Sequence, residues 1–225
     1  MRGIVLLLAA GEGTRIGTGE PKAFLDVAGV PVIRRAFEAA MGAELVHGVV
    51  VAAPAGYERR VESLVPPEGD RSVTVVTGGS TRQASAAAAL AAAPATDAFL
   101  VHDAARALAP SSLFDAVLRE LDSCEAACPG RPVVDTIKVV DDGFVSSTLD
   151  RTSLIAVETP QGVRADLYRR AHEAAVADGF VGTDDVSLVE RLGVGVRIVP
   201  SVSPNPKITF AADVAFAEAL LRAER

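Results

Sequence analysis

The segment IVLLLAAGEGTRIG, residues 4–17, is the strongest indicator of fold class in this 225-residue chain. Its continuous apolar run, Ile4–Ala10, predicts a strand that is buried on both faces, as in a parallel sheet covered by helices. A glycine turn after such a strand lets backbone N–H groups approach a phosphate closely. The glycine spacing fits neither the dinucleotide-binding fingerprint nor the Walker A motif. The run is too short to span a bilayer and lacks a cleavage pattern, so we expect a soluble, cytoplasmic protein.

The alternation of apolar runs and helical stretches continues along the chain. Further buried strands are expected at 48–53, 73–77 and 99–102, with helices at 31–41, 56–64 and 81–93. This order predicts an α/β fold, a doubly wound, mostly parallel Rossmann-like sheet flanked by helices. Ligands of such sheets bind outside the carboxyl ends of the strands. We therefore expect the loops after Ala10, Thr77 and His102 to converge on one pocket.

The middle of the chain departs from this pattern. Between about 132 and 158, short extended runs at 136–140, 145–148 and 155–157 surround an Asp-Asp-Gly turn at 141–143. Asp-Gly between β-prone runs is a strong hairpin signal, so we expect a protruding β-arm, whose apolar residues invite a partner chain. Helices at 165–177, 184–192 and 211–222 and a strand at 196–199 follow. We interpret residues 1–225 as a single domain with this insertion.

Composition and charge exclude several classes of protein. The net charge is −7 and no Lys/Arg run is present, which argues against a nucleic-acid partner. Cations for a phosphate ligand must therefore be local. The two cysteines, Cys124 and Cys128, lie in an Ala-rich segment that we expect to be helical. With no histidine nearby, they indicate neither a zinc site nor a disulfide scaffold.

Two cations accompany the glycine turn. Arg15 lies inside it and Lys22 follows Pro21, and fixed cations beside a phosphate cradle are what phosphoryl transfer requires. The chain has only three lysines, at 22, 138 and 207. Where arginine supplies nearly all the positive charge, a lysine is more often one that the function requires. The alternative is a plain strand–turn–helix with a solvated Arg and Lys.

Two later segments also follow strands. In TGGSTRQAS, residues 77–85, the amides and the hydroxyls of Ser80 and Ser85 could contact a base or phosphate, although a capped helix explains the pattern equally well. In VHDAAR, residues 101–106, Asp103 and Arg106 could bind magnesium, a ribose or a phosphorylated substrate. His102 is more simply a structural histidine.

With these motifs, the chain resembles the 2-C-methyl-D-erythritol 4-phosphate cytidylyltransferase family of the non-mevalonate isoprenoid pathway. The matching segments, in order, are 8–25, 78–85, 101–106, 135–138, 150–151, 159–161, 183–187 and 205–209. The resemblance implies transfer of CMP from CTP to 2-C-methyl-D-erythritol 4-phosphate, which gives 4-diphosphocytidyl-2-C-methyl-D-erythritol and pyrophosphate.

The resemblance also implies a role for each matching position. The catalytic residues would be Arg15, Lys22, Arg151 and Lys207. The nucleotide would be bound by Ala9, Ala10, Gly11, Gly13, Gly79, Ser85 and Asp103. The polyol phosphate would be bound by Asp103, Arg106, Thr136, Arg151, Thr183 and Lys207. The family is homodimeric, the arm with Thr136 and Arg151 reaches the partner's site, and Mg²⁺ is held mainly by the CTP phosphates rather than by a certain protein ligand.

Two alternatives and four departures accompany this interpretation. A ribitol 5-phosphate cytidylyltransferase shares the turn, the Asp-Ala-x-Arg run and the arm. A catalytically inactive nucleotide-binding module would be signalled by loss of Arg15 or Lys22, and both are present. The chain departs from the usual family pattern at Ala107, Glu158, Val163 and Pro206, and none of these removes a proposed cation or nucleotide-binding residue.

Overall fold

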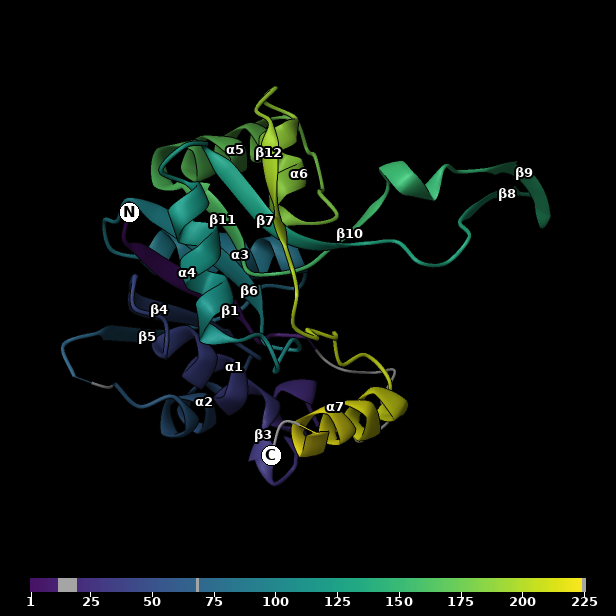
Figure 1. Cartoon of the computed structure of the whole chain (residues 1–225). Helices are drawn as coiled ribbons and strands as arrows, with labels where there is room; N and C mark the ends of the chain where they lie inside the picture. The colour runs from purple at the N-terminus through teal and green to yellow at the C-terminus, as the bar shows by residue number, and fades with distance from the viewer. Residues whose placement is uncertain (12–19, 68, 224–225) are drawn as a thin grey trace.

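A mixed, mostly parallel sheet forms the centre of the computed structural model, which describes residues 1–11, 20–67 and 69–223 (Figure 1). Its strand order is β10-β7-β11-β6-β1-β4-β5, and β12 pairs with β7. Pairing is parallel except at β11 and β10. The expected mostly parallel sheet is therefore confirmed. The strands are β1 (Gly3–Leu8), β4 (Val46–Ala53), β5 (Ser72–Thr77), β6 (Ala98–Asp103), β7 (Ala126–Pro132), β10 (Ile155–Val157), β11 (Gln161–Arg164) and β12 (Val196–Pro200).

Helices cover both faces of this sheet (Figure 1). One face packs against α1 (Val32–Met41), α2 (Glu58–Leu64) and α4 (Ser111–Glu120). The other packs against α3 (Arg82–Ala92), α5 (Ala165–Ala177) and α6 (Asp185–Glu190). The C-terminal α7 (Ala211–Ala223) lies beside the small ladder of β2 (Asp26–Val27) and β3 (Val30–Pro31). None of the helices in the described ranges is long and apolar enough to cross a membrane.

The first strand shows why its sequence is apolar at every position. Val5 and Leu7 enter the core under α1 and α4, whereas Ile4, Leu6 and Leu8 enter the core under α3 and α5. Successive side chains of a strand point to opposite faces, so a strand with helices on both sides needs no polar positions.

A β-hairpin extends away from this body (Figure 1). It consists of β8 (Lys138–Asp141) and β9 (Phe144–Thr148), which pair antiparallel, and the 3-10 helix η2 (Arg151–Ser153) leads back to the sheet. Asp142 and Gly143 have φ values of 44° and 79°, the left-handed pair that a tight hairpin turn needs. Large apolar side chains are exposed on it, with Phe144 78% exposed.

The cysteine segment differs from the expectation. Cys128 lies in strand β7 and Cys124 in the turn before it, so the predicted helix there is wrong. Pro129 and Gly130 oppose a helix, and Ala126–Cys128 are buried in the sheet beside β11 and β12. The residues of β7 include none of the β-branched types that favour strands, so the sequence did not predict this strand. Burial raises the pKa of the Cys128 thiol to about 12, and nearby Asp184 adds to the shift.

Candidate active site

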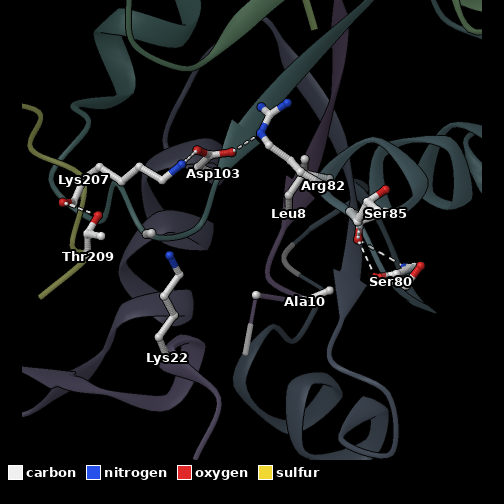
Figure 2. Close-up of a pocket in the computed structure, with 13 residues that line it drawn as sticks. Leu8, Ala10, Lys22, Ser80, Arg82, Ser85, Asp103, Lys207 and Thr209 are labelled. Atoms are coloured by element: carbon white, nitrogen blue, oxygen red, sulfur yellow. Dashed lines mark hydrogen bonds and ion pairs between the residues drawn. The ribbon is translucent and has the colours of Figure 1, made fainter. Parts of the chain in front are cut away.

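A cavity of about 400 Å³ opens at the carboxyl ends of β1, β5 and β6 (Figure 2). Its walls come from the three loops that follow these strands, from η1 (Lys22–Phe24) and from the segment before α7. The expected convergence of the loops after these strands is therefore confirmed. The lining residues are Leu8, Ala10, Gly11, Lys22, Gly79, Ser80, Thr81, Arg82, Ser85, Asp103, Ala105, Lys207 and Thr209.

One wall is the tight loop between β5 and α3. The Ser85 hydroxyl donates to the carbonyl of Thr81 at 2.9 Å, and its oxygen accepts from the Gly79 amide at 3.1 Å. Thr81 caps α3 by accepting from the Ala84 amide. A Cβ on Gly79 would lie 2.4 Å from the Cβ of Ala84 and 2.8 Å from its carbonyl carbon. This wall therefore has a fixed backbone and no room for a side chain at residue 79.

Two lysines reach the cavity from segments far apart in the sequence. Lys22 begins η1, directly after Pro21, and its side chain passes Gly11 so closely that a Cβ there would lie 3.3 Å from its Cε. Lys207 comes from the loop before α7 (Figure 2). Together with Arg82 they give the described wall three cations beside one carboxylate, Asp103. Such a surface attracts an anion.

Asp103 ends β6 and pairs with two of these cations. Its Oδ1 accepts from Arg82 Nε at 2.9 Å and its Oδ2 from Lys207 Nζ at 2.6 Å (Figure 2). Burial by itself would raise the pKa of Asp103, but the charges of Arg82 and Lys207 outweigh it and hold the pKa well below its usual range. Asp103 is therefore ionised at neutral pH, and it fixes where the Lys207 ammonium lies.

His102 is held in its neutral form behind this carboxylate. Its Nε2 lies 3.3 Å from the carbonyl of Arg106, so Nε2 carries the proton and donates. Its Nδ1 then accepts from the Thr159 hydroxyl at 3.0 Å, while the Thr159 oxygen accepts from the Asp103 amide. Burial lowers the pKa of His102 to about 4. The structural interpretation of this histidine therefore agrees with its contacts.

Arg106 is not part of the cavity lining. Its guanidinium donates to the carbonyl of Asn205 at 2.6 Å and to that of Val157 at 3.4 Å. The Asn205 side chain in turn donates to the Thr159 carbonyl, and the Ile208 amide donates to that of Ala105. Arg106 thus joins the root of the arm to the loop that carries Lys207.

The departures from the family pattern have local partners. Glu158 is buried, lies 2.6 Å from Arg131 and accepts from the Ser201 hydroxyl. Val163 packs in the core under α5, and Ala107 packs with Ile208 below α7. A buried carboxylate is tolerated only when paired, so Arg131 makes glutamate acceptable at 158.

The structure brings some predicted site residues together and separates others. The cavity wall includes Ala10, Gly11, Lys22, Gly79, Ser85, Asp103 and Lys207. Gly13 and Arg15 lie outside the described residues. Not lining the cavity of their own chain are Ala9, Arg106, Thr136, Arg151 and Thr183. Ala9 is buried just beneath the wall, whereas Thr136 and Arg151 are exposed on the arm and Thr183 is exposed before α6.

Arg82 and Thr209 line the cavity but were not among the predicted site residues. The sequence feature that could have identified Arg82 is its position at the start of a helix, directly after the Gly-Gly loop. Thr209 follows Lys207 by two residues, and its hydroxyl contacts the Lys207 carbonyl at 3.3 Å.

The cavity offers a divalent metal few ligands of its own. Among the described residues no group of three or more His, Cys, Asp or Glu side chains could hold a metal ion. Asp103 is the one acidic side chain in the described wall, and both its oxygens face cations. This donor set suits Mg²⁺ that keeps most of its bonds to phosphate oxygens and water.

Known proteins resemble this chain in sequence and in fold. The family model described as IspD, 2-C-methyl-D-erythritol 4-phosphate cytidylyltransferase, matches residues 4–223. Proteins of that name from Nocardia farcinica and Rhodococcus jostii are 45% and 46% identical, and the alignments cover 97% of this chain and 93% and 94% of theirs. The crystal structure of the Thermus thermophilus enzyme of that name is 35% identical, with a TM-score of 0.81 and coverage of 99% of this chain and 100% of that one. The chain belongs to the 2-C-methyl-D-erythritol 4-phosphate cytidylyltransferase family.

Proposed function

We propose that this enzyme transfers CMP from CTP to 2-C-methyl-D-erythritol 4-phosphate. A phosphate oxygen of the acceptor forms a bond to the α-phosphorus of CTP, and the bond from that phosphorus to the oxygen bridging the α- and β-phosphates breaks. The products are 4-diphosphocytidyl-2-C-methyl-D-erythritol and pyrophosphate. The observation that carries the proposal is the cationic cavity, in which Lys22 and Lys207 enter one space from separate segments.

The two lysines suit different parts of this reaction. Lys22 stands beside Gly11, just after β1, where the triphosphate would lie, and would stabilise charge that develops at the α-phosphate together with Arg15. Lys207 lies on the other side, next to Asp103, and would hold the acceptor phosphate. A phosphate nucleophile is already ionised at neutral pH, so no general base is needed. The neutral His102 fits that requirement.

The loop between β5 and α3 suits recognition of the base. The Gly79 peptide and the Ser85 hydroxyl are fixed against one another and lie in the cavity wall. We infer that they read cytosine, with Ala10 and Gly11 beside the phosphates. A wall that hydrogen-bonds one base edge leaves polar groups unpaired with another base, which costs affinity.

Mg²⁺ would enter with the nucleotide. When bound to the triphosphate, it neutralises charge on the phosphate oxygens and so favours attack by a second phosphate. The protein's share is then to place cations around the remaining oxygens, which Lys22 and Lys207 suit. Among the described lining residues, Asp103 is the carboxylate that could also contact this Mg²⁺.

The arm suits a homodimer in which each chain completes the other's site. Thr136 and Arg151 are exposed on a hairpin that extends from the body, and neither lines the cavity of its own chain (Figure 1). Val134 and Phe144 are each 78% exposed there. Exposed apolar side chains on a projecting hairpin are a liability unless a partner covers them.

Pyrophosphate release by the purified protein tests the reaction. CTP with 2-C-methyl-D-erythritol 4-phosphate should give turnover, while ATP, GTP and UTP should give far less. Ribitol 5-phosphate is the matched acceptor control, because it presents the same phosphate on another polyol. Preference for ribitol 5-phosphate, or equal turnover of CTP and GTP, would reject the assignment.

Mixing two inactive variants tests the shared site. Arg151→Ala and Lys22→Ala chains should each be inactive, and free exchange of subunits in an equal mixture should restore about a quarter of the activity per chain. Half of the dimers are then mixed, and each mixed dimer holds one intact site. No recovery despite demonstrated exchange would mean that each site is built from one chain.

A further inference from the structure

A row of side chains with alternating charges, here called the charge chain, runs from the cavity into the core between β6, α3, α5 and α6. It begins at Lys207, passes through Asp103 to Arg82, and continues to Asp185. Arg82 Nη1 lies 2.6 Å from Asp185 Oδ2, and Asp185 Oδ1 accepts from the Tyr168 hydroxyl at 2.5 Å. The far end therefore lies away from the cavity wall, in which neither Asp185 nor Tyr168 takes part.

The buried end of the charge chain, at Asp185 and Tyr168, is tightly held. The Asp185 side chain is only 2% exposed, and its backbone amide is fixed by the Gln161 side chain. Tyr168 is fully buried, with its ring 4.6 Å from His172 and 6.1 Å from Phe99. A buried carboxylate requires a partner cation, so Asp185 keeps Arg82 in one orientation. The Arg82 guanidinium cannot turn away from Asp185 without leaving that buried charge unpaired.

The cavity end of the charge chain, at Lys207, is less constrained. The Lys207 side chain is 41% exposed and comes from a loop without regular structure. Lysine has a long flexible stem, so its ammonium would sample many positions if Asp103 were not fixed. Asp103 is fixed because Arg82 holds one of its oxygens, which leaves the other facing Lys207.

We propose that Arg82, Asp185 and Tyr168 are positioning residues, which set the place of the Lys207 ammonium through Asp103. The inference rests on the proposed role of Lys207 in holding the acceptor phosphate. It extends the site beyond its wall, to two buried side chains that touch no substrate. Loss of the Tyr168 hydroxyl loosens Asp185, then Arg82, and the acceptor phosphate meets a less ordered cation.

Tyr168→Phe is the sharpest test because it removes one oxygen. The KM for the polyol phosphate should rise by roughly 3–10-fold, while the KM for CTP stays within about twofold of wild type. The chain's other tyrosine supplies the matched control: Tyr57→Phe keeps its ring against Phe24, outside the charge chain, and should leave both constants unchanged. Asp185→Asn should act in the same direction as Tyr168→Phe and more strongly.

A double-mutant cycle separates positioning from a merely structural role. In a Lys207→Ala background, Tyr168→Phe should have no further effect on acceptor KM, since the cation that it positions is gone. Additive effects, a parallel rise in both KM values with a lower melting temperature, or a wild-type acceptor KM in both Tyr168→Phe and Asp185→Asn would overturn the proposal. If Tyr168→Phe folds poorly, Arg82→Lys carries the same cycle, because it keeps the positive charge beside Asp185 but lacks the guanidinium that contacts both carboxylates.

Calorimetry keeps this test independent of turnover. Binding of 2-C-methyl-D-erythritol 4-phosphate to wild type, Tyr168→Phe, Lys207→Ala and the double variant should give the same non-additive pattern. If the wild type binds this ester but releases no pyrophosphate from CTP, the proposed reaction fails while the positioning proposal is still decided. If removing Lys207 leaves binding unchanged, the positioning proposal fails.

Discussion

Gly79→Ala should disable the nucleotide wall while leaving the rest of the cavity intact. The new Cβ would lie 2.4 Å from the Cβ of Ala84, about 1 Å short of the 3.4 Å at which ordinary contact begins. It would also lie 2.8 Å from the Ala84 carbonyl carbon, which belongs to the backbone of α3 and cannot rotate away. The Gly-Gly loop must therefore shift by about 1 Å.

A shift of this size has a calculable cost. Misplacement of a binding group by about 1 Å can slow an enzyme by roughly 10²-fold, which corresponds to about 3 kcal/mol of barrier. The hydrogen bonds between Ser85 and Gly79 would be strained as the loop moves. Overpacking should also lower the free energy of unfolding by about 1–3 kcal/mol.

Steady-state pyrophosphate release at varied CTP, with the acceptor saturating, measures the loss as kcat/KM. Gly195→Ala is the matched control, because a Cβ there meets no atom within 4 Å and its φ is not in the left-handed region. That variant should match wild type in both rate and melting temperature. A folded Gly79→Ala enzyme within about threefold of wild type, less than 1 kcal/mol of barrier, would show that the Gly-Gly loop accommodates the added Cβ.

Two further predictions concern the lysines and the buried histidine. Lys22→Ala should lower kcat by roughly 10²–10³-fold with a smaller loss of CTP affinity, whereas Lys207→Ala should raise the acceptor KM; near-wild-type kinetics in both would leave the assigned roles without support. His102 has a folded pKa of about 4, below its unfolded value of about 6.5, so its stabilisation is complete above pH 6.5 and is lost as the pH falls toward 4. Urea unfolding should show that wild type loses about 2 kcal/mol more than His102→Gln between pH 7 and pH 5, and equal losses would count against a buried neutral imidazole.

The local parts of the fold were predictable from the sequence. Strand β1 has apolar residues on both faces, and the turn at Asp142 and Gly143 needs left-handed backbone that Asp-Gly supplies. Strands β7 and β11 were not predicted, because their short or small-residue sequences become strands only when neighbours distant in the chain flank them.

The site was predictable as a set of loops and not as a set of contacts. Asp103 and Arg106 are three residues apart after the same strand, yet one faces the cavity and the other the arm root. Arg82 meets Asp185 only because α3 and α6 cover the same face of the sheet. Spacing along the chain contains no information on either pairing, since both depend on the assembled layers.

The buried charge chain also constrains how this site changes in evolution. Positions 82, 103, 185 and 207 balance two cations against two anions. Loss of the charge at 82 would leave the buried Asp185 without a cation, and a reversed charge at any of the four would place like charges side by side. Single replacements of opposite or absent charge should therefore be rare among homologues, while swaps such as aspartate for glutamate remain accessible. The charges at these four positions should therefore change together or not at all, although the positions are far apart in the sequence and Asp185 does not line the cavity.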